Sequence, residues 1–278
     1  MTAKSESDRA LTHVHLTLHP DGVSVPAKRA ALEATQAVGA CLRAIEHDDM
    51  SIPTIGDTSA YKFEGLDLSA DEYRELTQHW LLTKGFQDLT RGVRETLEEA
   101  YFYLEMIKTK PGRTNWNQVE ATMARHKKSA QRLNFPQLIQ RVNSGLREPM
   151  AFDGPFLSMQ KLRNCLEHRG GIVGQSDVDE GTLWLTVAIP RLKFFYLLDG
   201  LEVEFEMGKP IQSNETVGAD GKQPEVQIFL KQEVRTKAFG LGEKIRLTDV
   251  EFAEVAFACQ MFADDVAKKL PTLPPPLA

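Results

Sequence analysis

One short segment of the chain holds an arginine and a histidine at a spacing that could serve phosphate chemistry. It reads LRNCLEHRGG and contains Arg163, Asn164 and His168. An imidazole can act as a general acid or base near neutral pH, and a guanidinium can stabilise charge that develops on a phosphate. Asn164 lies four residues before His168, so on a helix its amide could hydrogen-bond and orient the imidazole. Residues of these types at this spacing could therefore act on a phosphate group.

The helix that would carry these residues leaves Arg163 and His168 outside its apolar stripe. The stripe consists of Met159, Leu162, Cys165 and Leu166. At about 100° per residue, Arg163 and His168 lie about 140° apart around the helix axis. That angle is too wide for both groups to bind one phosphate from a straight helix. We therefore expect either that the helix unwinds near Gly170 or that a second subunit supplies the missing partner.

The bare spacing of arginine and histidine is weak support, because it occurs again over residues 9–15 and 74–79. The later segment differs in its context, since an asparagine follows the arginine, an apolar stripe anchors the helix and two glycines end it. The alternative is that Arg163 and His168 are ordinary solvated groups of an amphipathic helix. In that case they would pair with Glu167 or with another nearby acid.

In this context the segment from Arg163 to His168 resembles the HEPN superfamily. Members of that superfamily carry an Arg-x4–6-His motif at the end of a late helix, with a polar residue, often asparagine, directly after the arginine. The resemblance covers about residues 27–173 as an architecture, a small helical bundle. It implies a metal-independent endoribonuclease, often a toxin or a defence protein. It also implies a homodimer whose motif helices lie near the two-fold axis.

The resemblance further implies a role for each residue of the motif. His168 would act as general base or acid on the ribose 2′-OH, Arg163 would stabilise the pentavalent phosphorane, and Asn164 would support them. The product would be a 2′,3′-cyclic phosphate, with no metal and no other cofactor. Some members of the superfamily keep the fold without cleaving RNA. The alternative function is therefore a non-catalytic RNA-binding or protein-dimerisation module.

The motif also bears on the partners of the chain. Family toxins that are paired with a nucleotidyltransferase antitoxin carry a tyrosine where this chain has Gly170, so we do not predict that regulation. RNA, a second copy of the chain, and another cognate antitoxin or regulatory protein are the partners we expect. A different class of function is a structural or regulatory dimerisation protein that recruits its partner through the apolar C-terminal helix, with Phe252, Val255 and Phe262.

Basic residues gather just before the motif helix. Between Lys108 and Arg147 the chain holds nine basic residues and one acidic residue, although its net charge is −6. We expect either a positive region that draws RNA toward the motif, or a solvated face that binds nothing. The candidate RNA-binding residues are Arg125, Lys127, Lys128 and Arg132 in the basic stretch, and Lys161 and Arg169 beside the motif.

Most elements that must position the motif are predicted to be helices. Apolar periodicity predicts helices over residues 27–47, 70–109, 117–133, 136–143, 156–168 and 248–270. Ser69 and Glu72 predict a capping box at the start of the second helix, and Gly85 could interrupt that helix. Short β-branched and aromatic runs predict antiparallel strands at 182–190, 191–198, 201–207 and 225–234. Turns are expected at Asp199-Gly200 and Asp220-Gly221.

The fold class is therefore mainly α within the α+β class. We expect an HEPN-like antiparallel helical bundle, then a small antiparallel β-sheet, then a C-terminal helix. The predicted regions are an N-terminal extension that could form an edge strand (1–25), the bundle (26–175), the sheet (181–247), a helix that packs on the bundle (248–270) and a Pro-rich tail (271–278). The sheet could cover the bundle, recognise a substrate or hold an inhibitor.

Composition excludes several other classes of protein. The 278 residues are 42% apolar and 26% charged, which is typical of a globular domain, and the three cysteines are too few and too widely spaced for a disulfide framework or a zinc site. The sequence has no signal peptide and no long apolar span, so we expect a cytoplasmic protein without membrane contact. His13, His15 and His19 alternate but lack further ligands, so no metal site is predicted.

Overall fold

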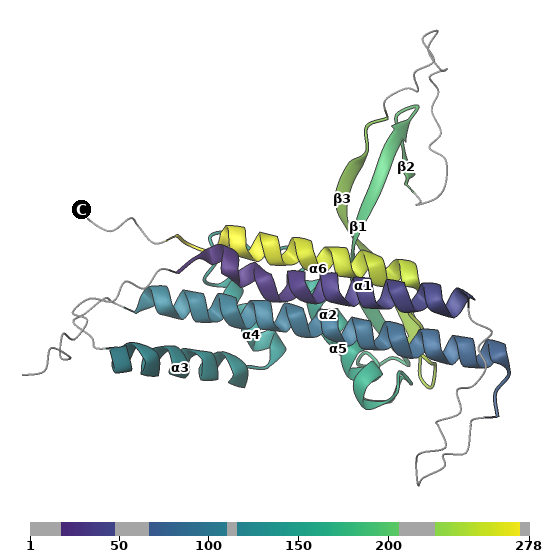
Figure 1. Ribbon diagram of the computed structural model, residues 1–278, viewed down its shortest axis with the longest axis horizontal. Coiled ribbons are helices and arrows are strands. Elements are labelled where there is room, and N and C mark those ends of the chain that lie inside the picture. The colour runs from purple at the N-terminus through teal and green to yellow at the C-terminus, as the bar shows by residue number, and fades with distance from the viewer. Residues whose placement is uncertain (1–17, 48–66, 110–115, 206–225, 273–278) are drawn as a thin grey trace, which may run out of the picture.

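The fold is described from a computed structural model, which describes residues 18–47, 67–109, 116–205 and 226–272. The helices are η2 (Pro20–Ser24, a 3₁₀-helix), α1 (Val25–His47), α2 (Ala70–Lys108), α3 (Trp116–Arg132), α4 (Phe135–Asn143), α5 (Asp153–His168) and α6 (Asp249–Lys269). The strands are β1 (Trp184–Leu198), β2 (Leu201–Glu204) and β3 (Phe229–Gly240). The predicted fold class, mainly α with a small antiparallel sheet and a C-terminal helix, is confirmed (Figure 1).

The long helix α2 runs along α1 and α6 and forms the axis of the molecule (Figure 1). It begins at the predicted capping box, in which Ser69 accepts from the Glu72 N–H and the Glu72 carboxylate accepts from the Ser69 N–H. The predicted interruption at Gly85 is wrong. A Cβ at this glycine would lie 2.7 Å from the Phe252 ring, so the missing side chain lets α6 approach a continuous α2.

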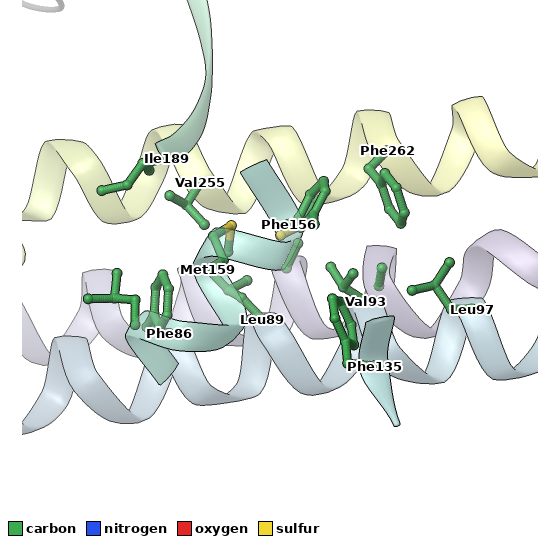
Figure 2. Packing of buried hydrophobic residues seen from close by; sticks show 14 of the residues in the cluster. Phe86, Leu89, Val93, Leu97, Phe135, Phe156, Met159, Ile189, Val255 and Phe262 are labelled. Atoms are coloured by element: carbon green, nitrogen blue, oxygen red, sulfur yellow. The ribbon is translucent and has the colours of Figure 1, made fainter. Parts of the chain in front are cut away.

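The motif helix α5 is anchored in the centre of the core. Phe156 and Met159 of α5 lie among buried residues of α2 and α6, as Figure 2 shows, and the Phe156 and Phe262 rings are 4.3 Å apart. The helix begins at Asp153, three residues before the predicted start, and ends at His168 as predicted. Gly170 and Gly171 follow it with positive φ angles of 60° and 82°, a conformation that favours glycine and turns the chain.

The sheet has the order β2-β1-β3, and both pairings are antiparallel. The prediction of separate strands before and after Pro190 is wrong, because β1 is continuous through this proline. Thr186 and Ala188 donate their N–H groups to Asp179 and Ser158, away from β3, and Pro190 lies in the same alternating set. Its missing N–H therefore costs no bond to β3. The predicted turn at Asp199-Gly200 is confirmed, with φ angles of 52° and 78°.

The other strands also depart from their predicted limits. β3 extends to Gly240, six residues beyond the predicted end, and β2 ends at Glu204. The expected turn at Asp220-Gly221 lies outside the described residues. Side chains of the first half of β1 and the end of β3 lie in the hydrophobic core, namely Leu185, Val187, Ile189 and Phe239. The other ends of these strands project away from the helices with β2, and we call this projection the β-arm (Figure 1).

Candidate functional site

The polar side of α5 carries the candidate site, because the opposite side is buried as predicted. Met159, Leu162, Cys165 and Leu166 are each at most 4% exposed. The His168 side chain, at the last position of the helix, is 62% exposed, and the Arg163 side chain is 31% exposed. A ligand can therefore reach the imidazole directly from solvent, whereas the guanidinium is partly covered by its neighbours.

Arg163 and His168 meet at one oxygen of Glu167. The Arg163 Nη2 forms an ion pair with the Glu167 Oε2, and the His168 Nε2 lies 4.0 Å from that same oxygen, too far for a hydrogen bond. The pair between Arg163 and Glu167 is the one expected if these groups are ordinary residues of an amphipathic helix, and the expectation that one straight helix cannot bind a phosphate with both groups stays a prediction. A long arginine side chain reaches one turn along the helix, so its guanidinium lies near the same carboxylate as the imidazole despite the angle between the two Cα positions.

Asn164 contacts the arginine rather than the histidine. Its Oδ1 accepts hydrogen bonds from Gln160 Nε2 at 3.0 Å and from Arg163 Nη1 at 3.3 Å. The bond that we predicted from Asn164 to the imidazole is absent from the described structure, and the amide oxygen instead accepts from Gln160, one turn earlier, and from Arg163. Asn164 thus helps to hold the guanidinium, and it does not fix the orientation of His168.

Arg169 holds the turn after the motif. Its guanidinium donates from Nε and Nη2 to the buried carboxylate of Asp177, which also accepts from the Gly174 N–H at 2.9 Å. These bonds give Arg169 a structural role, and its predicted role in RNA binding stays a prediction. Nearby, burial and Asp177 raise the pKa of Cys165 to about 11, so this thiol stays protonated and donates to the Ile172 carbonyl.

A second imidazole lies against the same turn. His79 of α2 places its Nε2 3.7 Å from the position that a Cβ on Gly171 would occupy. Burial, and then the positive charges of Lys244 and Arg246, lower the pKa of His79, so this imidazole is neutral at pH 7. In the sequence, the arginine and histidine over residues 74–79 lack the context that favours the later motif. Only the fold, which brings the first half of α2 beside the end of α5, gives His79 a place near the motif.

The basic residues of α3 lie on an exposed helix. Arg125, Lys127, Lys128 and Arg132 are all exposed, and in the described part of the chain none of them has an ion pair. Lys127 Nζ lies 5.3 Å from the centroid of the Phe102 ring, which places this part of α3 beside the second half of α2. Trp116, at the start of α3, is 50% exposed. These groups are free to contact an anionic ligand.

The structure separates this basic helix from the motif. Along α2, Lys127 lies beside Phe102, and the turn after the motif lies beside His79. The 23 residues between them correspond to about 35 Å at 1.5 Å per residue. The expectation that the basic stretch leads directly into the motif holds along the chain but not in space. Lys161, on α5 itself, forms an ion pair with Asp179 at 3.2 Å.

The remaining predictions concern the alternating histidines near the N-terminus, metal sites and membrane contact. His13 and His15 lie outside the described residues, and His19 precedes the 3₁₀-helix η2 instead of lying on a strand. Across the described ranges, no group of three or more metal-ligating side chains comes together. Among the described helices, none has the length and apolarity to cross a bilayer.

Comparisons with known proteins add no relative. No family model, no curated protein and no solved structure matches the chain. The resemblance to the HEPN superfamily therefore depends on the motif residues and their helix. The function must be argued from the geometry around Glu167 and from the charge of α3.

Proposed function

We propose that this chain is a metal-independent endoribonuclease of HEPN type, in which Arg163 and His168 act on one phosphodiester. The observation that carries the proposal is the single carboxylate oxygen of Glu167 that lies beside both groups. An anionic oxygen in that position resembles, in charge and hydrogen-bonding capacity, a non-bridging oxygen of an RNA phosphate. In the proposed reaction, a phosphate oxygen takes the place of the Glu167 oxygen.

The proposed reaction is an internal transfer at phosphorus. His168 removes the proton from the ribose 2′-OH, the 2′-oxygen attacks phosphorus, and the bond to the 5′-oxygen of the next nucleotide breaks. Arg163, held in part by Asn164, stabilises the charge on the phosphorane, and the leaving 5′-oxygen takes a proton from water or from a protein acid. The products are a 2′,3′-cyclic phosphate and a free 5′-OH.

The exposed cations of α3 supply the electrostatic attraction for RNA in this proposal. Lys127, Lys128 and their neighbours lie about 35 Å from the motif turn along α2. An RNA that contacts both regions must therefore extend along much of the helix. The proposal expects strands of a dozen nucleotides or more to be cut better than dinucleotides, because only the longer strands reach both regions.

Incubation of the protein with a single-stranded RNA in EDTA tests the proposal. The wild type should produce fragments with 2′,3′-cyclic phosphate ends, identified by mass spectrometry, and His168→Ala should lower the rate by at least about a hundredfold. His47→Ala, which changes an exposed histidine at the end of α1, is the matched control and should keep the wild-type rate. Equal background cleavage by wild type and His168→Ala would reject the enzyme.

The pairing of Arg163 with Glu167 favours a second candidate, a non-catalytic RNA-binding module of the same fold. In that case the α3 cations alone bind RNA, and the motif residues serve α5. Binding would be sensitive to salt, would weaken when Lys127 and Lys128 are changed, and would not respond to His168→Ala. A homodimer, a cognate antitoxin or other regulatory protein, and a cytoplasmic location remain predictions.

A further inference from the structure

One edge of the β-arm is open for pairing with another strand. β3 pairs with β1 over its whole length, and among the described residues it has no strand on its other side. β2 lies on the opposite side of β1 and pairs only with residues 195–198. The distal half of β3 projects beyond the helices, so in the described structure no helix covers this edge (Figure 1).

The register shows which backbone groups face outward. Even-numbered residues of β1 direct their polar groups away from β3, since Ala188 donates to Ser158 and the Phe194 carbonyl accepts from Phe205. The odd-numbered pairs, such as Arg191 with Glu233, therefore hold the hydrogen bonds between β1 and β3. The even-numbered residues of β3 are left with N–H and C=O groups that point to the free edge. Among the described residues, no backbone group pairs with them, as at any open sheet edge.

The side chains of β3 separate into two chemically different faces. The odd face is charged and is already bound within the chain, with Lys231 2.6 Å from Glu202, Arg235 3.0 Å from Glu254 and Lys237 2.8 Å from Glu251. The even face carries no charge and is exposed along β3; Leu230 and Val234 are each 45% exposed. An incoming strand would thus meet apolar side chains on one face and ordered charges on the other.

We propose that the β-arm joins two copies of this chain, with β3 pairing antiparallel to β3 of a second copy about a two-fold axis at Gln232. In this register Leu230 lies opposite the partner's Val234, and Lys231 lies opposite the partner's Glu233. The partner's lysine then adds a third cation beside Glu233, which already pairs with Arg191 and Lys231 of its own chain. Apolar pairs form on one face and opposite charges on the other, so both faces of the strand are complementary to a copy of themselves.

Charge selects this register among those that use the same outward groups. A shift of the axis by two residues, to Val234, would place Glu233 opposite the partner's Arg235 but Lys231 opposite the partner's Lys237, and an axis at Thr236 would place Arg235 opposite the partner's Lys237. Like charges directly opposite each other destabilise a strand pair. An axis at Leu230 would place Lys231 opposite the partner's Phe229 and form no Lys–Glu pair. Of these four registers, the axis at Gln232 is the one that forms Lys–Glu pairs without placing like charges opposite each other.

This interface is independent of the proposed nuclease. Gln232 lies eight residues from Gly240 at the base of the sheet, about 26 Å at 3.3 Å per residue. The axis therefore lies on the far side of α6 from the end of α5, and each Arg163 and His168 pair stays within its own subunit (Figure 1). This differs from the predicted dimer, in which the two motif helices meet at the axis.

A proline at the free edge tests the proposal. The Val234 N–H points outward, so Val234→Pro removes a bond to the partner strand while it leaves the pairing with β1 intact. Light scattering on the full chain should give twice 31.2 kDa for the wild type and for the control Val234→Thr, and 31.2 kDa for Val234→Pro with an unchanged circular dichroism spectrum. A monomeric wild type at about 100 μM, or a dimeric Val234→Pro, would overturn the proposal.

Cysteine cross-linking fixes the axis, in a Cys41→Ser background because Cys41 is exposed. Gln232→Cys places the two sulfur atoms across the axis, where a disulfide can close, and mild oxidation should cross-link it. Thr236→Cys, on the same exposed face, should not, because its copies would lie about 26 Å apart. Ile172→Cys, exposed beside the motif, reports the rival dimer. A cross-link at residue 172 or 236 without one at 232 would reject the proposed axis.

Discussion

The cations of α5 and those of α3 differ in what they contact. On α5 and just after it, Lys161, Arg163 and Arg169 each bind a carboxylate of the same chain. On α3, the cations are exposed, and across the described residues they make no ion pair. The cations of the motif region are therefore paired within the chain, whereas those of α3 are open to solvent. Of the motif groups, the His168 side chain is the one largely open to solvent.

Removal of a structural partner on the α5 side should have the largest effect. Asp177→Ala leaves the Arg169 guanidinium and the Gly174 N–H without their buried acceptor, so the free energy of unfolding should fall by about 2 kcal/mol in urea denaturation. Asp71→Ala removes the partner of Arg74 at an exposed position and is the control, with a loss below about 0.5 kcal/mol. Equal losses would mean that Asp177 does not hold the turn.

Changes on α3 should reduce binding and leave stability unaltered. Lys127→Ala together with Lys128→Ala should weaken RNA binding about tenfold and lower the slope of log K against log salt by about two, because two phosphate contacts are lost. Fluorescence anisotropy at several salt concentrations measures both quantities. Lys84→Ala, on an exposed part of α2, is the matched control. An unchanged salt slope in the double variant would show that RNA does not contact α3.

Neutralising Glu167 should leave the Arg163 guanidinium unpaired, like the cations of α3. In Glu167→Gln the guanidinium of Arg163 loses its ion pair, so RNA should bind a few times more tightly, and cleavage should be faster at low RNA concentration. Binding and initial rates on the same RNA check this. If cleavage slows while binding stays constant, Glu167 supports His168 rather than competing with the phosphate.

Acid should loosen the contact between the sheet and α6. Burial raises the pKa of Glu251, but bonds from Lys237 and from the Thr248 N–H outweigh it, so the pKa of this carboxyl lies below its usual 4.5. Its contribution to stability is present above the unfolded-state value and is lost as pH falls through the lower folded-state value. Hydrogen exchange of β3 amides should therefore rise below about pH 4.5 in the wild type. Glu251→Gln should flatten this dependence.

The helices could be predicted because their signals are local. Ser69 and Glu72 mark the start of α2, and the double glycine marks the end of α5, so both limits agree with the structure. Gly85 and Pro190 gave wrong predictions, because their effect is not decided by local sequence. Each is a residue type that often ends an element, but whether it does so depends on the surrounding fold. Gly85 is needed where the Phe252 ring of α6 approaches α2, and the N–H that Pro190 lacks would point away from β3.

The site was only partly accessible from the sequence. The exposure of His168 and the burial of Cys165 follow from helical periodicity, and the structure agrees. The meeting of Arg163 and His168 at Glu167 depends on side-chain conformation, which the angle between Cα positions does not give. Likewise, adjacency along the chain placed the basic stretch beside the motif, whereas packing of α3 on the second half of α2 separates them.

A crystal structure of the protein with an RNA that carries a single 2′-deoxynucleotide, and so cannot react at that position, tests the central claim most directly. We predict a phosphate oxygen between the Arg163 Nη2 and the His168 Nε2, where the Glu167 Oε2 now lies, with the Glu167 side chain turned away. An RNA bound along α3 with the Arg163 and Glu167 pair still closed would contradict the claim.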